Sequence, residues 1–247
     1  MYLPPSYDAS PDRRYPVVYM QDGWNAFDDA TSFSSEWGAD ETAQDLAERG
    51  LEVIVVAVTQ DIVPSSFKRL SEYGPWTDFL GLASGQGGQY AAFLAQTLKP
   101  FVDSRFRTLR DAPHTAVIGS SMGGLISLYT AFEYPRTFGF VGALSPALWF
   151  ADGQMFRHLA TRASPNLRVY TDIGSSEHMG VIWDSARFVR DTAHLAQMLE
   201  SRVAAVRWGV FHGADHSETQ WRTRLPAVLE WFLSADAPRS ETTGQAR

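Results

Sequence analysis

The chain has 247 residues, of which 45% are hydrophobic, and it carries a formal net charge of −7 with no block of like charges. This acidic balance argues against nucleic acid or an anionic membrane surface as the main partner, because both select for basic patches. The sequence contains no Cys, which excludes a disulfide framework, a thiol nucleophile and a cysteine-based metal site. Serine, histidine and carboxylate side chains are therefore left to carry any catalytic chemistry.

The length and the hydrophobic content are enough to bury a sizeable core, and we expect a single domain over residues 1–234. Residues 235–247 are mostly polar and are predicted to form a disordered tail. No run of about 18 apolar residues occurs, and the N-terminus lacks the basic and apolar regions of a signal peptide. The expected compartment is the cytoplasm.

The first predicted strand covers residues 15–20, Tyr-Pro-Val-Val-Tyr-Met, which form a nearly continuous apolar run. Such a run is typical of a strand that is buried on both faces of a mostly parallel sheet. It ends at residues 21–25, Gln-Asp-Gly-Trp-Asn. A turn just beyond a central strand is where open α/β sheets bind ligands, so this turn is a candidate functional loop. A plain Asp-Gly turn is the alternative.

A helix is predicted over residues 40–49 and a buried strand over residues 52–58, so that with the first strand they form a βαβ unit. Residues 59–88 are rich in Gly, Pro and aromatic residues and are expected to form an irregular functional loop. Tyr73 and Trp76 in this loop could line a substrate pocket, although such aromatics also pack a loop down. Arg69 and Glu72, three residues apart, are expected to form a structural ion pair.

After a helix predicted over residues 89–102, a strand leads into residues 119–123, Gly-Ser-Ser-Met-Gly, which have the form G-x-S-x-G. A helical apolar pattern begins at once. This succession of strand, sharp turn and helix is the pattern of the nucleophile elbow of α/β-hydrolases. Ser121 is therefore the predicted nucleophile, and the backbone N–H groups of Met122 and Trp24 are the predicted oxyanion donors. For these five residues taken alone, a structural turn is the alternative.

Two further strands are predicted over residues 138–145 and 167–173. Trp149 follows the first of them at the carboxyl edge of the sheet, where it is either a pocket residue or part of the core. A Gly-led turn containing Glu177 follows the second, and a carboxylate in this position can hold a catalytic imidazole. Glu177 is the predicted acid, with Asp172, at the end of the strand, and Asp184 as rivals.

His216 lies in a Gly-containing loop between a strand predicted over residues 203–211 and the final helix. It is the predicted general base, and His212, nearer the strand end, is the alternative. The chain order of Ser121, Glu177 and His216 is that of nucleophile, acid and base in α/β-hydrolases, and it differs from the order in chymotrypsin-like and subtilisin-like proteases.

These motifs resemble the esterase family of α/β-hydrolases that includes esterase D, enterochelin esterase, feruloyl esterases and mycolyltransferases. The resemblance is carried by Leu-Pro-Pro-Ser-Tyr at 3–7, the strand and turn at 15–23, Arg-Leu-Ser-Glu-Tyr at 69–73, Gly-Ser-Ser-Met-Gly-Gly at 119–124, Ser-Pro-Ala-Leu-Trp at 145–149 and His-Ser-Glu-Thr-Gln-Trp at 216–221. It implies an α/β-hydrolase fold, with a mostly parallel sheet covered by helices on both faces. It also implies a triad of Ser121, Glu177 and His216, with the N–H groups of Trp24 and Met122 as the oxyanion hole.

Family members usually have one or more strands before the Leu-Pro-Pro segment, and here almost nothing precedes it. We therefore expect either that the sheet lacks its first edge strands or that the natural start lies upstream, which leaves a signal peptide open.

The resemblance implies a serine carboxylesterase that hydrolyses a small-molecule ester through an acyl-enzyme, without a metal or cofactor. An acyltransferase and a siderophore esterase of the enterochelin type are alternatives on the same triad. The acidic balance and the lack of clustered basic side chains do not favour an anionic ferric catecholate. A catalytically silent binding module on a hydrolase fold is the non-enzyme alternative.

Overall fold

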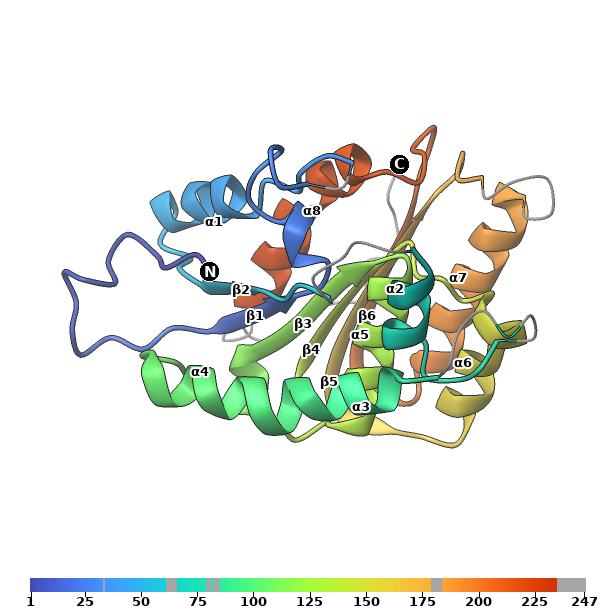
Figure 1. Cartoon of the computed structure of the whole chain (residues 1–247), viewed down its shortest axis with the longest axis horizontal. Coiled ribbons are helices and arrows are strands. Elements are labelled where there is room, and N and C mark those ends of the chain that lie inside the picture. The colour runs from blue at the N-terminus through green and yellow to red at the C-terminus, as the bar shows by residue number, and fades with distance from the viewer. Residues whose placement is uncertain (33, 61–65, 79–80, 82–84, 179–183, 235–247) are drawn as a thin grey trace.

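The computed structural model of the chain describes residues 1–32, 34–60, 66–78, 81, 85–178 and 184–234. Within these residues, six strands form one parallel sheet in the order β2-β1-β3-β4-β5-β6 (Figure 1). The strands are β1 (Val17–Met20), β2 (Ile54–Ala57), β3 (Thr115–Ser120), β4 (Phe140–Leu144), β5 (Ser164–Gly174) and β6 (Val203–Phe211). The predicted mostly parallel sheet is confirmed. The tail predicted over residues 235–247 lies outside the described residues.

Alternate side chains of the strands supply two separate cores, because successive Cβ atoms of a strand point to opposite faces of the sheet. In β1, Val17 and Tyr19 belong to one core, and Val18 and Met20 to the other. All four residues of β1 are buried, which explains the continuous apolar run in the sequence. Helices therefore cover both faces of the sheet (Figure 1).

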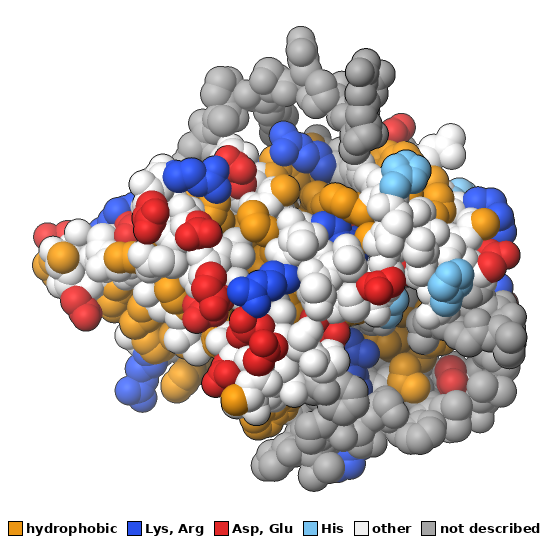
Figure 2. Space-filling view, turned by 90° about the horizontal axis from the view of Figure 1, so that it is seen from above, with side chains coloured by type: hydrophobic (Ala, Val, Ile, Leu, Met, Phe, Trp, Pro, Cys, Tyr) orange, Lys and Arg blue, Asp and Glu red, His pale blue; other side chains and the backbone are white. Residues whose placement is uncertain are grey.

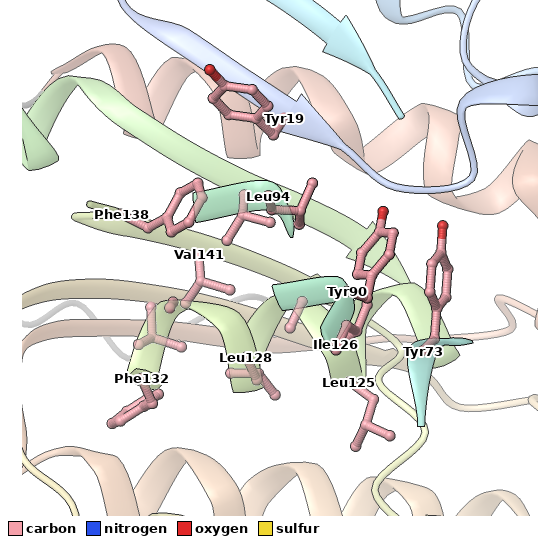
Figure 3. Packing of buried hydrophobic residues seen from close by; sticks show 14 of the residues in the cluster. Tyr19, Tyr73, Tyr90, Leu94, Leu125, Ile126, Leu128, Phe132, Phe138 and Val141 are labelled. Carbon is pink, nitrogen blue, oxygen red and sulfur yellow. The ribbon is translucent and has the colours of Figure 1, made fainter. Parts of the chain in front are cut away.

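The first core is covered by α3 (Gly87–Phe93), α5 (Met122–Glu133), α6 (Phe150–Ala160) and α7 (Ser185–Leu199). Figure 3 shows part of it, including Tyr19 of β1, Val141 of β4 and several side chains of α5. The second core is covered by α1 (Ala39–Glu48) and α8 (Glu218–Leu233). The predicted helix over residues 40–49 is α1, and the one over residues 89–102 is α3 followed by a π-helical turn (Leu94–Leu98) and α4 (Lys99–Arg105).

Two helices were not predicted. α2 (Ser66–Tyr73) lies inside the segment that was expected to be irregular, and it is only 8 residues long among Gly and Pro residues. α6 has three residues of positive φ directly after its first residue, Ala151, Asp152 and Gly153, and these interrupt the regular helical repeat. Short or broken helices of this kind leave too few periodic positions for a pattern to reveal them.

The face that carries α1 and α8 mixes acidic and basic side chains (Figure 2). Ion pairs on this face connect α8 to the residues on either side of α1. The distance is 3.0 Å between Arg49 and Glu230 and 2.6 Å between Arg222 and Glu36. At the sheet edge, Tyr2 forms an isolated antiparallel bridge with Val55, so the start of the chain lies beside β2. None of the helices in the described part of the chain is long and apolar enough to cross a bilayer.

Candidate active site

Ser121 stands at the sharp turn between β3 and α5, with φ 54° and ψ −122°. Backbone strain of this kind costs a non-Gly residue roughly 1–3 kcal/mol. Close packing requires the two flanking glycines: a Cβ on Gly119 would lie 2.7 Å from the Gly123 carbonyl carbon, and one on Gly123 would lie 2.9 Å from Asp22 Oδ2. The predicted strand, sharp turn and helix are all present, and Ser121 lies at the carboxyl end of β3.

Glu177 and His216 are joined by a hydrogen bond of 2.8 Å between Oε2 and Nδ1. Glu177 follows β5 and His216 follows β6, so the carboxyl ends of two neighbouring parallel strands bring the side chains together. Glu177 is 0% exposed, whereas His216 is partly exposed. A buried carboxylate on one ring nitrogen fixes the imidazole orientation and leaves the other nitrogen for proton transfer.

The second oxygen of Glu177 is held by Ser145 and by the backbone. Ser145 Oγ donates to Oε1 at 2.5 Å, and the Gly174 N–H donates to the same oxygen at 2.6 Å. Ser145 Oγ in turn accepts the Trp221 Nε1–H at 3.0 Å. The Trp221 ring lies edge-on to the His216 ring, with the centroids 4.9 Å apart. Ser145 was not predicted as a site residue, although it begins the Ser-Pro-Ala-Leu-Trp motif.

The two rival carboxylates have other partners. Asp172 is paired with Arg224 at 2.8 Å, both side chains 0% exposed, and it accepts the Tyr170 hydroxyl at 3.0 Å. Burial raises the pKa of Asp172 to about 6, although the Arg224 guanidinium beside it acts in the opposite direction. Asp184 caps α7 by accepting the Arg187 N–H at 2.7 Å. Of the three carboxylates, Glu177 is the one that contacts His216 in the described part of the chain.

Within the described residues, no hydrogen bond joins the Ser121 hydroxyl, the nucleophile candidate, to His216, the base candidate. His212, the alternative base, is an exposed residue just beyond the end of β6.

Almost all backbone N–H groups of the turn after β1 donate a hydrogen bond within the described residues. The donors and their acceptors are Gln21 to Ile118 O, Asp22 to the Tyr73 hydroxyl, Gly23 to Val58 O, Asn25 to Asp22 O and Ala26 to Gly23 O. The Trp24 N–H is the one in this stretch that has no acceptor among the described residues. The Met122 N–H, at the first position of α5, likewise has no acceptor in this part of the chain. The roles of these two N–H groups as oxyanion donors stay predictions.

The structure corrects the pocket role of Tyr73. Its side chain is 0% exposed, so it cannot line a pocket, and its hydroxyl accepts the Asp22 N–H at 3.0 Å. Trp76 is partly buried, with its ring edge-on to Tyr129 at a centroid distance of 5.8 Å. Trp149 is also partly buried and packs against the first core. Pocket roles for Trp76 and Trp149 stay predictions.

The prediction that Arg69 and Glu72 form an ion pair is wrong. Arg69 pairs with Asp22 instead, at 2.6 Å, because α2 turns this side chain toward the turn after β1. Among the residues that the structure describes, no three His, Asp or Glu side chains are grouped so as to hold a metal ion.

The parallel sheet and the strained serine turn between β3 and α5 define an α/β-hydrolase fold. The chain belongs to the family described as "Putative esterase", whose family model matches residues 1–232. This membership indicates an ester hydrolase.

Similar proteins were found in bacteria and fungi. The uncharacterized protein YbbA of Bacillus subtilis is 28% identical over 244 residues, which cover 94% of this chain and 90% of YbbA. The siderophore hydrolase EstA from Aspergillus nidulans has a TM-score of 0.71 at 21% identity, covering 93% of this chain and 88% of EstA. An IroE-like serine hydrolase from Shewanella oneidensis has a TM-score of 0.74 at 19% identity, covering 94% of this chain and 74% of that one. At these identities, the likeness to the two solved structures shows the fold alone.

Proposed function

We propose that the protein is a serine carboxylesterase in which Ser121 is the nucleophile, His216 the general base and Glu177 the acid that supports the base. The observation that carries the proposal is the 2.8 Å hydrogen bond between the buried Glu177 carboxylate and His216 Nδ1. The Ser121 N–H donates to Leu144 O at 3.0 Å, so the serine turn lies next to Ser145, which binds Glu177. Family membership supports the same reading.

In the proposed reaction, Ser121 Oγ attacks the carbonyl carbon of the ester while His216 accepts the hydroxyl proton. The carbonyl oxygen becomes an oxyanion that accepts hydrogen bonds from the Trp24 and Met122 N–H groups. The ester C–O bond then breaks, and His216 gives its proton to the departing alcohol. Water attacks the acyl-enzyme with His216 as base, which releases the acid and restores Ser121. Throughout, Glu177 stabilises the imidazolium form of His216.

A ladder of p-nitrophenyl esters of increasing acyl length tests this proposal. We expect the wild type to hydrolyse at least one ester and Ser121→Ala to lose about 1,000-fold or more in kcat, because the nucleophile is removed. Ser127→Ala is the matched control, since the buried Ser127 hydroxyl in α5 has no hydrogen-bond partner among the described residues. It should keep wild-type activity. Hydrolysis by Ser121→Ala at the wild-type rate would refute the mechanism.

The same triad would also serve a siderophore esterase or an acyltransferase. The siderophore hydrolase EstA, which shares the fold, gives a reason to test the former. A feruloyl ester and a tris-catecholate trilactone, compared with the p-nitrophenyl ladder, identify the acyl class. Product analysis with added alcohol separates transfer from hydrolysis. A silent binding module would turn over none of these esters, and a fluorophosphonate would fail to label Ser121.

A further inference from the structure

Arg69 of α2 forms a bidentate ion pair with the Asp22 carboxylate. Arg69 Nε lies 2.6 Å from Oδ1, and Arg69 Nη2 lies 2.7 Å from Oδ2. Gln60 adds a hydrogen bond to Oδ1 at 3.2 Å. A guanidinium fork fixes a carboxylate in both position and orientation, which a single contact does not. Asp22 is therefore held more firmly than an ordinary turn residue.

The backbone of Asp22 is held as well. It is left-handed, with φ 53° and ψ 49°, a conformation that non-Gly residues adopt at a cost. Its N–H donates to the hydroxyl of Tyr73, one turn after Arg69 on α2, at 3.0 Å. The guanidinium of Arg69 lies 5.3 Å from the centroid of the Tyr73 ring. Residues at i and i+4 share one face of a helix, so α2 presents both side chains to the same turn.

Asp22 also touches the start of α5. A Cβ added to Gly123 would lie 2.9 Å from Asp22 Oδ2, so the carboxylate packs directly on the residue after Met122. Asp22 is thus two residues before Trp24 in the chain and packs against the helix that begins with Met122. The negative charge of the Asp22 carboxylate would destabilise an oxyanion formed nearby, because like charges in a low-dielectric site repel strongly. The cation of Arg69 offsets that charge.

We propose that Arg69 is a positioning residue for acyl transfer, which acts through Asp22 to aim the Trp24 N–H at the oxyanion and to neutralise the carboxylate beside it. The inference rests on the proposed function and adds to it a residue that does not contact the substrate. It gives α2 a role in catalysis. Tyr90 of α3 supports the same turn, since its hydroxyl donates to Gln21 Oε1.

The test compares kcat and KM of wild type, Ser121→Ala, Arg69→Gln, Arg69→Lys and the double variant Arg69→Gln/Asp22→Asn on one p-nitrophenyl ester. Removing a whole oxyanion donor costs about 100- to 1,000-fold in kcat, so a misaimed donor in Arg69→Gln should cost about 10- to 100-fold. KM should change less than threefold, because the ground-state ester does not need this contact. Arg69→Lys keeps the charge without the fork and should fall between Arg69→Gln and wild type.

In the double variant, Asp22→Asn removes the charge that Arg69→Gln left without its partner. We expect its kcat to be equal to or above that of Arg69→Gln. Two independent losses that multiply would overturn the charge part of the proposal.

Asp103→Asn is the matched control for a lost ion pair. It breaks the 2.5 Å ion pair between Lys99 and Asp103 in α4. These two side chains are buried to a similar degree as Arg69 and Asp22. Their other polar partners, Thr108 and Arg110, lie outside the site. Its kcat should stay within twofold of wild type at a comparable loss of Tm. An Arg69→Gln variant with wild-type kcat, a change confined to KM, or an equal kcat loss in Asp103→Asn would overturn the inference.

The first two proteins of the series keep the two proposals apart. An active wild type and an inactive Ser121→Ala support the proposed function whatever Arg69→Gln does. A wild type without esterase activity overturns the proposed function, and the inference falls with it. Should Arg69→Gln fail to fold, Arg69→Lys with full wild-type kcat overturns the inference, and a reduced kcat at unchanged KM supports it.

Discussion

Ser145 Oγ donates to Glu177 Oε1 at 2.5 Å, on the carboxylate oxygen opposite to the one that binds His216. Ser145 has a φ of 43°, and its hydroxyl also accepts the Trp221 Nε1–H. Ser145, just after β4, therefore links Glu177, which follows β5, to Trp221 in α8, the helix after His216. The Glu177 carboxylate has little freedom to rotate away from the imidazole.

The first prediction concerns this serine. Ser145→Ala leaves the buried Trp221 N–H without its acceptor, and Glu177 loses one donor, so the free energy of unfolding should fall by about 1–3 kcal/mol. The proposed reaction should slow about tenfold, because Glu177 orients His216 less well. Urea unfolding and ester kinetics measure the two effects.

Ser127→Ala serves as the control, because it removes a buried hydroxyl that has no partner in the described structure. It should leave both the free energy of unfolding and kcat close to wild type. Equal losses in the two variants would mean that the Ser145 contacts contribute nothing beyond packing.

The second prediction separates the two acid candidates on β5 and its following turn. Glu177→Gln preserves the shape but cannot stabilise an imidazolium, and in serine hydrolases the equivalent change costs about 10,000-fold in kcat. Asp172→Asn should keep kcat within about tenfold, because Asp172 is bound to Arg224 and Tyr170. Steady-state kinetics on one ester decide the matter. A larger loss in Asp172→Asn than in Glu177→Gln would reverse the assignment.

The strands could be predicted because their environment is visible locally. All residues of β1, β3 and β4 are buried, so each strand is a short apolar run whatever its neighbours are. The helix α2 could not be predicted from its own 8 residues. Its Arg69 and Tyr73 bind the turn after β1, and contacts across the fold do not appear in a local pattern.

The residues of the candidate site could likewise be predicted only in part. Ser121, Glu177 and His216 could be chosen from their chain order and from the turns in which they lie. Ser145 could not, since its role depends on a positive φ and on partners from two distant segments. Tyr73 was misassigned to the pocket because an aromatic residue in a Gly-rich segment does not reveal whether its ring faces solvent or the core.

The third prediction concerns pH. Burial raises the pKa of Asp172 from 3.8 to about 6, with Arg224 opposing and Glu177 adding to this shift. The folded state therefore binds this proton more tightly than the unfolded state does. The resulting stabilisation is fully present below pH 3.8 and is lost as the pH rises through about 6. Two units of pKa correspond to about 3 kcal/mol.

Asp172→Asn cannot titrate and lacks this dependence. Relative to wild type, we expect its free energy of unfolding to increase by up to about 3 kcal/mol between about pH 4 and pH 7. Urea unfolding of both proteins across this range measures the difference, in which the contributions of the other carboxyl groups cancel. A difference that is constant with pH would contradict the raised pKa.

The fourth prediction concerns the space between the elbow and the turn after β1. In Gly123→Ala, the new methyl group would meet Asp22 Oδ2 at 2.9 Å and Gln21 Cβ at 3.1 Å. Because Arg69 holds the Asp22 carboxylate, the turn that carries Trp24 must shift, and kcat should fall about 10- to 100-fold while the fold loses about 1–3 kcal/mol. Gly209→Ala on β6, where a Cβ meets nothing within 4 Å, should leave kcat unchanged. Ester kinetics and urea unfolding of both variants check this, and a Gly123→Ala protein with wild-type kcat would show that the turn and the elbow need not lie this close for turnover.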